Sequence, residues 1–242
     1  MGYGCTGEYY WEMEKVPEWE ELIIELPHTF SAFRNSGQKL SILRNNEQVQ
    51  YINENSLCNY ELLFGELLGA LNEHSNGNTP QPLKHWILLG AVTEVTLQII
   101  LAVYYTDYIK ERWQLWDGVD VESVKNELSK VLQQEVELGK LTPQQKKSIS
   151  GAISKKIEEH TSEHSIRRIM LEELIQFAEK TGLLYNDSLL DQLRIIQRNR
   201  NGIHAFSDRG IDGWDVLRTS VNSLGYIMND FSGRFTAEID DY

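Results

Sequence analysis

The chain has 242 residues, 41% of them hydrophobic, and carries a net charge of −13 because 36 acidic residues outnumber 23 basic ones. This acidity excludes a general nucleic-acid coat, since non-specific binding to phosphates depends on clustered Lys and Arg. Any RNA would have to bind at a local basic patch. The two cysteines, Cys5 and Cys58, are too few for a disulfide framework or a cysteine zinc site. The N-terminus lacks the basic start and apolar run of a signal peptide, so we expect a cytoplasmic protein.

Few prolines and many Leu, Glu, Gln and Lys predict helices along most of the chain. After an aromatic and acidic arm (residues 1–16), a first helix is expected over 17–34, interrupted at Pro27. The run Asn35-Ser-Gly-Gln38 should end it. A short helix over 39–44 and an amphipathic helix over 47–72 follow.

The loop from His74 to Pro82 contains Gly77 and two prolines and is the expected domain boundary. It would separate an N-terminal helical accessory region, 1–78, from a main bundle, 79–242, in which 117–165 is a possible insertion. Residues 86–105 are long and apolar enough to span a bilayer. Glu94 near their middle favours instead the central helix of a soluble bundle, so no membrane contact is expected.

The second half continues as helices separated by caps and glycines. The expected helices are 83–113, 121–138 after the cap Asp120, 143–160 after the cap Thr142, 166–180 before Gly182, 187–201 capped by Asp187 or Ser188, and 213–231. No strand pattern or internal repeat is visible. We therefore predict an all-α helical bundle.

The helix over 187–201 carries the most informative pattern. Leu189, Leu193 and Ile196 should face the core, whereas Arg194, Arg198 and Asn201 should form a polar stripe beside them. Gly202 can leave helical geometry at little steric cost, which would let His204 turn back toward Arg198.

An arginine beside a histidine suits transfer at phosphorus. The guanidinium fork matches phosphate oxygens, and the imidazole titrates near neutrality. RNA supplies its own 2′-OH nucleophile, so no metal or cofactor is required. Arg194, Arg198 and Arg200 would form the local basic patch. Taken alone, an Arg and a His at this spacing are more often structural than catalytic.

The run Arg198-Asn-Arg-Asn-Gly-Ile-His204 resembles the Arg-x4–6-His motif of HEPN domains, in which a polar residue commonly follows the arginine. The apolar helix carrying Glu94 and the later helix with Trp214 near its start are also similar to that family. The resemblance is good over 187–231 and loose over 83–232. It implies a HEPN-type bundle with additional N-terminal helices that forms a homodimer and cuts RNA without metal. It also implies a toxin or an anti-phage defence effector, with an antitoxin or other regulatory protein as a possible partner.

The resemblance also implies roles for individual residues. Arg198 would bind the scissile phosphate, His204 would move the proton, and Asn199 would orient one of them or contact phosphate. Arg194, Arg200 and Asn201 would add substrate contacts. Glu94 would orient Arg198 if their helices pack together.

One position departs from the family pattern. Members that a partner nucleotidyltransferase silences carry a Tyr two residues after the His, and Phe206 stands there in this chain. The resemblance therefore does not extend to silencing by that route.

Two other readings compete with the ribonuclease. The chain could be a non-catalytic interaction module, adaptor-like or antitoxin-like, whose acidic surface binds a basic protein. A membrane-attached protein would need residues 86–105 to face lipid. His160 and His164 share a helix face and could hold a metal, but no third ligand stands at a telling spacing, so an exposed polar face is expected.

Overall fold

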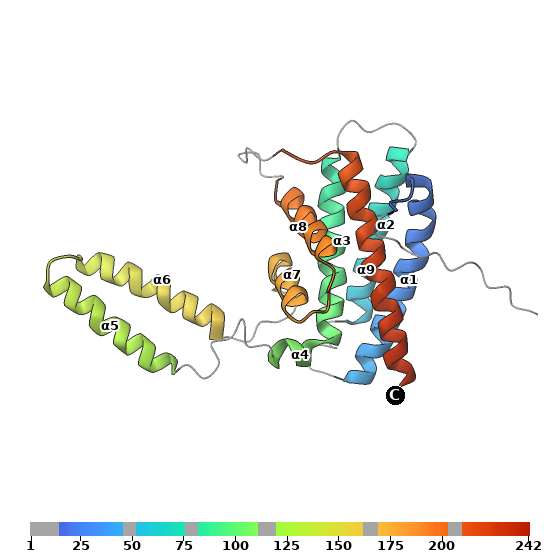
Figure 1. Ribbon diagram of the computed structural model, residues 1–242. Helices are drawn as coiled ribbons and strands as arrows, with labels where there is room; N and C mark the ends of the chain where they lie inside the picture. Colours follow the sequence, from blue (N-terminus) through green and yellow to red (C-terminus); the bar gives the residue numbers. More distant parts are fainter. Residues whose placement is uncertain (1–14, 46–51, 76–81, 111–119, 162–168, 203–209) are drawn as a thin grey trace, which may run out of the picture. The chain divides into compact units, whose positions relative to one another are not determined.

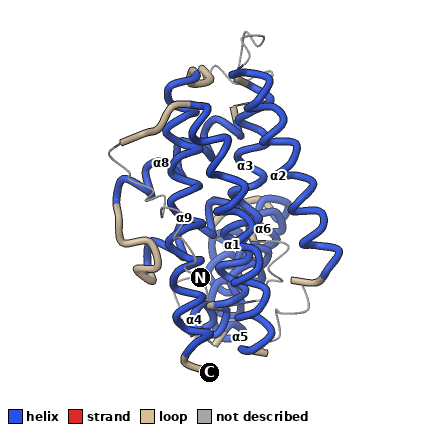
Figure 2. Tube along the Cα trace, turned by 90° about the vertical axis from the view of Figure 1, so that its right-hand side faces the viewer, coloured by secondary structure: helices blue, strands red, loops and turns tan. Residues whose placement is uncertain are grey.

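The computed structural model describes residues 15–45, 52–75, 82–110, 120–161, 169–202 and 210–242. Within these ranges every regular element is a helix, which confirms the all-α prediction (Figure 2). The helices are α1 (Trp19–Arg44), α2 (Glu54–Ser75), α3 (Leu83–Val103), α4 (Tyr105–Lys110), α5 (Val121–Glu137), α6 (Pro143–Thr161), α7 (Leu171–Lys180), α8 (Asp187–Asn201) and α9 (Trp214–Asp240) (Figure 1).

The chain divides into two compact units, and the division differs from the expected one. Residues 1–108 and 165–242 form the first unit, a helical bundle, and residues 109–164 form the second. Helices α1 and α2 therefore share a unit with α3, α7, α8 and α9, and α1 packs along α9. The contacts do not divide the chain near residue 78. The second unit covers nearly the same residues as the expected insertion, 117–165.

Helix α1 runs without a break through two places where the sequence predicted an interruption. Pro27 lies inside it, and the helix continues through residues 35–38. The core side of α1 is apolar on both sides of these places, and Leu26, Phe30 and Phe33 are buried. A Cβ on Gly37 would lie 3.0 Å from Ile99 Cγ2, so the glycine there permits close packing. Tertiary burial thus overrides local helix-breaking residues.

Helix α3 is the central helix of the first unit. It contacts α1, α2, α7, α8 and α9, and its side chains Trp86, Leu89 and Val92 are fully buried. By length and composition it is the one described helix that could cross a membrane, but 67% of its most apolar window is buried inside the protein. It ends at Val103, earlier than expected, and α4 follows directly.

The caps agree in part with the sequence. Asp120 Oδ1 accepts from Ser123 N at 3.1 Å, and Thr142 Oγ1 accepts from Gln145 N at 3.2 Å, as predicted. At α8, however, the cap is Asn186, whose Oδ1 accepts from Ser188 N at 2.9 Å. The prediction of Asp187 or Ser188 was wrong by one or two residues, because Asp187 already lies in the first turn.

Candidate functional site

The last two turns of α8 form the candidate site, and the predicted faces of this helix are confirmed. Leu189, Leu193 and Ile196 are buried, and Arg194 and Arg198 are exposed. Gly202 ends the helix in a right-handed conformation, with φ −70° and ψ −6°, and its N–H donates to the carbonyl of Arg198. Gly202 therefore stays in the right-handed helical region, although the sequence suggested that it would leave helical geometry.

Asn199 is 1% exposed, and its side-chain amide binds Asp212, which lies two residues before the start of α9. Its Nδ2 donates to Asp212 Oδ2 at 2.8 Å and to Ile195 O at 2.9 Å, and its Oδ1 accepts from Asp212 N at 2.8 Å. These bonds occupy all the amide's hydrogens. In this arrangement Asn199 holds Asp212 and does not face a substrate, which corrects the expectation of a phosphate contact.

Arg198 is the exposed cation at this position. Its Nη2 lies 2.5 Å from Asp212 Oδ2, and its side chain is 52% exposed. Hydrogen bonding from Asn199, followed by the bond and the charge of Arg198, holds the pKa of the Asp212 carboxyl below its usual value. A second anchor fixes the same residue, because Trp86 Nε1 donates to Asp212 O at 2.9 Å. Arg198 is therefore held at the surface by a carboxylate that the bundle itself positions.

Glu94 pairs with Arg200 and not with Arg198, which corrects the expected orienting role. The pair is partly buried, with the side chains 19% and 29% exposed. The stem of Arg200 lies over Gly90 of α3, where a Cβ would meet Arg200 Cδ at 2.7 Å. The Arg200 side chain therefore connects α8 to α3. Its guanidinium pairs with Glu94 and is not placed as a substrate contact.

The expected basic patch is neutralised in the described part of the site. Arg194 Nη2 lies 2.8 Å from Glu179 Oε2, so each of the three arginines has a carboxylate partner. Asn201, the last residue of α8, is exposed. Of the predicted substrate-binding residues, Arg194 and Asn201 lie at the surface, whereas Arg200 is partly buried and pairs with Glu94.

His204 lies outside the described residues, in the gap 203–209. The described chain resumes at residue 210, and there Ile211 Cγ1 lies 3.7 Å from the Cβ position of Gly202 and Asp212 is held by Asn199. The described residues on both sides of the gap therefore lie close to the end of α8.

A cluster of rings lies beside this site at one end of the bundle. His74 stacks on Trp214 with ring centroids 3.4 Å apart, and His85 meets the same ring edge-on at 4.7 Å. His85 Nε2 bonds to Ala70 O at 2.9 Å. Burial lowers the pKa of both imidazoles. The fold thus brings His74 and His85 together with Trp214, from α2, α3 and α9.

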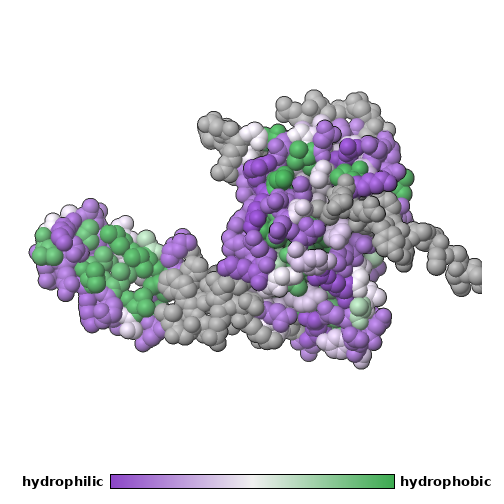
Figure 3. Space-filling view, in the orientation of Figure 1, coloured by the Kyte–Doolittle hydropathy of each residue, from purple (hydrophilic) through white to green (hydrophobic). Residues whose placement is uncertain are grey.

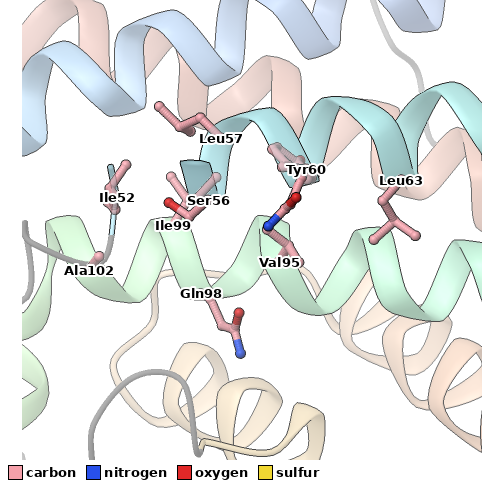
Figure 4. A pocket seen from close by; sticks show the side chains of 10 residues that line it. Ile52, Ser56, Leu57, Tyr60, Leu63, Val95, Gln98, Ile99 and Ala102 are labelled. Carbon is pink, nitrogen blue, oxygen red and sulfur yellow. The ribbon is translucent and has the colours of Figure 1, made fainter. Parts of the chain in front are cut away.

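A mostly apolar cavity of about 260 Å³ lies between α2 and α3 (Figure 4). Leu57 and Leu63 line it from α2, and Val95 and Ile99 line it from α3. Its polar lining residues include Gln98, whose side chain points away from α2. None of the predicted site residues lines it. Among the described residues no group of three or more His, Cys, Asp or Glu side chains could hold a metal ion; His160 and His164 have no described side chains.

Asp212 and Trp86 belong to the site but were not predicted from the sequence. Asp212 stands two residues before α9 and looks in sequence like an ordinary helix-capping acid, and Trp86 looks like one more apolar residue of α3. No family model matches the chain, and no curated protein or solved structure matches it. The structure defines the class as an all-α helical protein with a surface arginine that pairs with Asp212, a partly exposed carboxylate held by the buried Asn199.

Proposed function

We propose that the protein is a metal-independent endoribonuclease in which Arg198 binds the scissile phosphate and His204 moves the proton of the attacking 2′-OH. The observation that carries the proposal is the half-exposed Arg198, which pairs with Asp212 and precedes His204 by six residues in the sequence. One guanidinium nitrogen is occupied by Asp212. An arginine has five N–H donors, so further donors remain for phosphate oxygens.

The acidity of the chain sets the conditions under which this site works. Asp212 offsets the charge of Arg198, so affinity for RNA should be low and should depend on contacts formed during the reaction. Phosphate contacts that strengthen as charge develops raise the rate more than they raise binding. We propose a cytoplasmic homodimer that brings two such sites together, acting as a toxin or defence effector and controlled by an antitoxin or other regulatory protein.

The test is cleavage of a mixed RNA pool in the presence of EDTA. Wild type should cut and leave 2′,3′-cyclic phosphate ends, and His204→Ala and Arg198→Ala should each lower the rate by about 10²-fold or more. Arg194→Ala is the comparison within the same helix: it removes an exposed arginine one turn away that pairs with Glu179, and as a substrate contact alone it should lower the rate less. Equal cutting by wild type and His204→Ala would overturn the proposal.

A second candidate is a non-catalytic interaction module that binds a basic protein partner. The pairing of Arg194, Arg198 and Arg200 with carboxylates favours it, because the described part of the motif lacks the basic patch that RNA binding would use. This candidate predicts no cleavage by wild type under any metal or salt condition, together with binding to a basic polypeptide that weakens as salt increases.

A further inference from the structure

The second unit has an amphipathic face with no partner in the chain's own hairpin. Helices α5 and α6 are joined by a tight turn in which Gly139 has φ +70° and Lys140 N donates to Glu135 O at 3.0 Å. Lys146 Nζ of α6 donates to Gln133 Oε1 of α5 at 2.7 Å, so the two helices lie against each other as a hairpin. Among the described side chains of α5 and α6, Leu132 and Ile157 are the buried ones.

Large apolar side chains remain exposed along α5 at intervals of seven residues. Val124, Val131 and Leu138 are 39%, 53% and 65% exposed, and Ile149 of α6 is 36% exposed. A seven-residue interval places side chains on one face of a helix, which is the pattern of a helix–helix seam. Hydrophobic residues gather on the visible face of the hairpin (Figure 3). Two helices bury little surface between them and need a further layer.

The charges of the hairpin indicate what that layer is. α5 contains four acidic and two basic residues, a net −2, and α6 contains four basic and two acidic residues, a net +2. In a two-fold pair of antiparallel hairpins, α5 of one copy can face α6 of the other. The acidic α5 of each copy would then lie against the basic α6 of the other copy, so the pair contains this contact twice. An unrelated partner would not share this charge complementarity.

The distribution of charge over the whole chain points the same way. Residues 109–164 contain nine basic and ten acidic residues, a net −1, so residues 1–108 and 165–242 carry the remaining −12. Two copies of the chain repel each other through their bundles, whereas their hairpins are nearly neutral. The hairpin is thus the part of the protein where self-association meets little electrostatic cost.

We propose that the α5–α6 hairpin is a self-association surface, on which the hairpin of a second copy packs to complete a four-helix bundle. Val124, Val131 and Leu138 form its apolar seam, and the lysines of α6 face the glutamates of the partner's α5. This contact is separate from any pairing of the Arg198 sites and does not depend on ribonuclease activity.

The first experiment measures the molar mass of the full chain by light scattering during gel filtration, over a range of protein concentrations. Wild type should have at least twice the 28.0 kDa mass of one chain. Val131→Glu with Leu138→Glu should halve the wild-type mass. The matched control, Asn126→Glu with Ser129→Glu, adds the same charge at exposed polar positions of α5 and should keep it. Equal helical circular dichroism shows that all three chains fold, and Val131→Ala with Leu138→Ala, which adds no charge, should raise the dissociation constant.

The second experiment tests the charge pairing. Glu122→Lys with Glu127→Lys makes both helices basic, and Lys147→Glu with Lys155→Glu makes both acidic. Each double variant alone should lose the association, and an equal mixture of the two should recover it as a mixed pair. A monomeric wild type would overturn the proposal, as would an unchanged mass for Val131→Glu with Leu138→Glu. If both charge variants associate as strongly as wild type, the antiparallel pairing is wrong.

Discussion

Asn199 and Asp212 bind each other reciprocally. The buried amide donates to the carboxylate at 2.8 Å and accepts from the backbone N–H of the same aspartate at 2.8 Å. Thirteen residues separate them, and the pair closes the chain between the end of α8 and the start of α9. Arg198, next to the amide in sequence, shares the same carboxylate oxygen. The Asn199–Asp212 pair therefore both holds the chain before α9 against α8 and places the carboxylate that binds Arg198.

Replacing Asn199 by Ala should destabilise the protein by about 1–3 kcal/mol, because it leaves the partly buried N–H of Asp212 without its acceptor and removes a donor from the Asp212 carboxylate. Urea unfolding followed by circular dichroism measures the change. Asn201→Ala, at an exposed position two residues away, is the control and should change the free energy of unfolding by less than about 0.5 kcal/mol. If the protein is a ribonuclease, Asn199→Ala should also slow cleavage while Asn201→Ala slows it less.

The carboxyl of Asp212 should make stability depend on pH at the acid end. Its folded-state pKa is lowered from 3.8, first by the bond from Asn199 and further by Arg198, so its contribution is present above the unfolded pKa and is lost as pH falls through the folded pKa. Asp212→Asn should therefore be less stable than wild type near pH 7. The difference should shrink below about pH 4. Unfolding curves at both pH values measure it, and a difference that stayed constant would show that the carboxylate charge contributes nothing.

Gly90→Ala should force α3 and α8 apart. The added methyl would lie 2.7 Å from Arg200 Cδ and 2.9 Å from Arg200 Cβ, and Cβ cannot rotate away because it is bonded to the backbone. We expect a loss of about 1–3 kcal/mol, as for other overpacked interfaces. Gly69→Ala is the control, because a Cβ there meets nothing within 4 Å and alanine favours helix. A Gly90→Ala chain as stable as wild type would mean that this contact is looser than described.

Glu94 and Arg200 should be energetically coupled. The pair is partly buried, so a double-mutant cycle with Glu94→Gln and Arg200→Gln should give a coupling energy of about 1–2 kcal/mol. The same cycle on Glu73 and Lys84, which lie 4.0 Å apart with both side chains more than half exposed, should give less than about 0.5 kcal/mol. Coupling of Glu94 to Arg198 in place of Arg200 would contradict the observed pairing.

The ring cluster should weaken the fold in mild acid. Burial lowers the pKa of His74 and His85 from 6.5, so both imidazoles are neutral in the folded protein, and the unfolded chain binds more protons as pH falls below that value. The free energy of unfolding should therefore decrease from pH 7.5 to pH 5.5. His85→Asn should reduce this slope, whereas Asn201→Ala, at an exposed position without a titratable group, should leave it unchanged. Equal slopes for wild type and His85→Asn would exclude this histidine as the source.

Local patterns in the sequence determined much of the fold. The spacing of Leu189, Leu193 and Ile196 identified the buried face of α8, and Asp120 and Thr142 marked the starts of α5 and α6. These features depend on helix period and on capping by neighbouring residues, which act over a few positions. The interruptions predicted at Pro27 and near Gly37 were wrong. The local effect of these residues on the helix is weaker than the burial of α1 against α3 and α9.

Tertiary structure alone decided which charges meet. The sequence showed three arginines close together near the end of α8, but Glu179, Asp212 and Glu94, which neutralise them, come from three other segments. No local rule assigns Glu94 to Arg200 in place of Arg198, because the choice depends on Gly90 admitting the arginine stem between α3 and α8. The sequence thus determined the helices and the chemistry available at the motif, and the packing of distant segments decided which arginine stays at the surface.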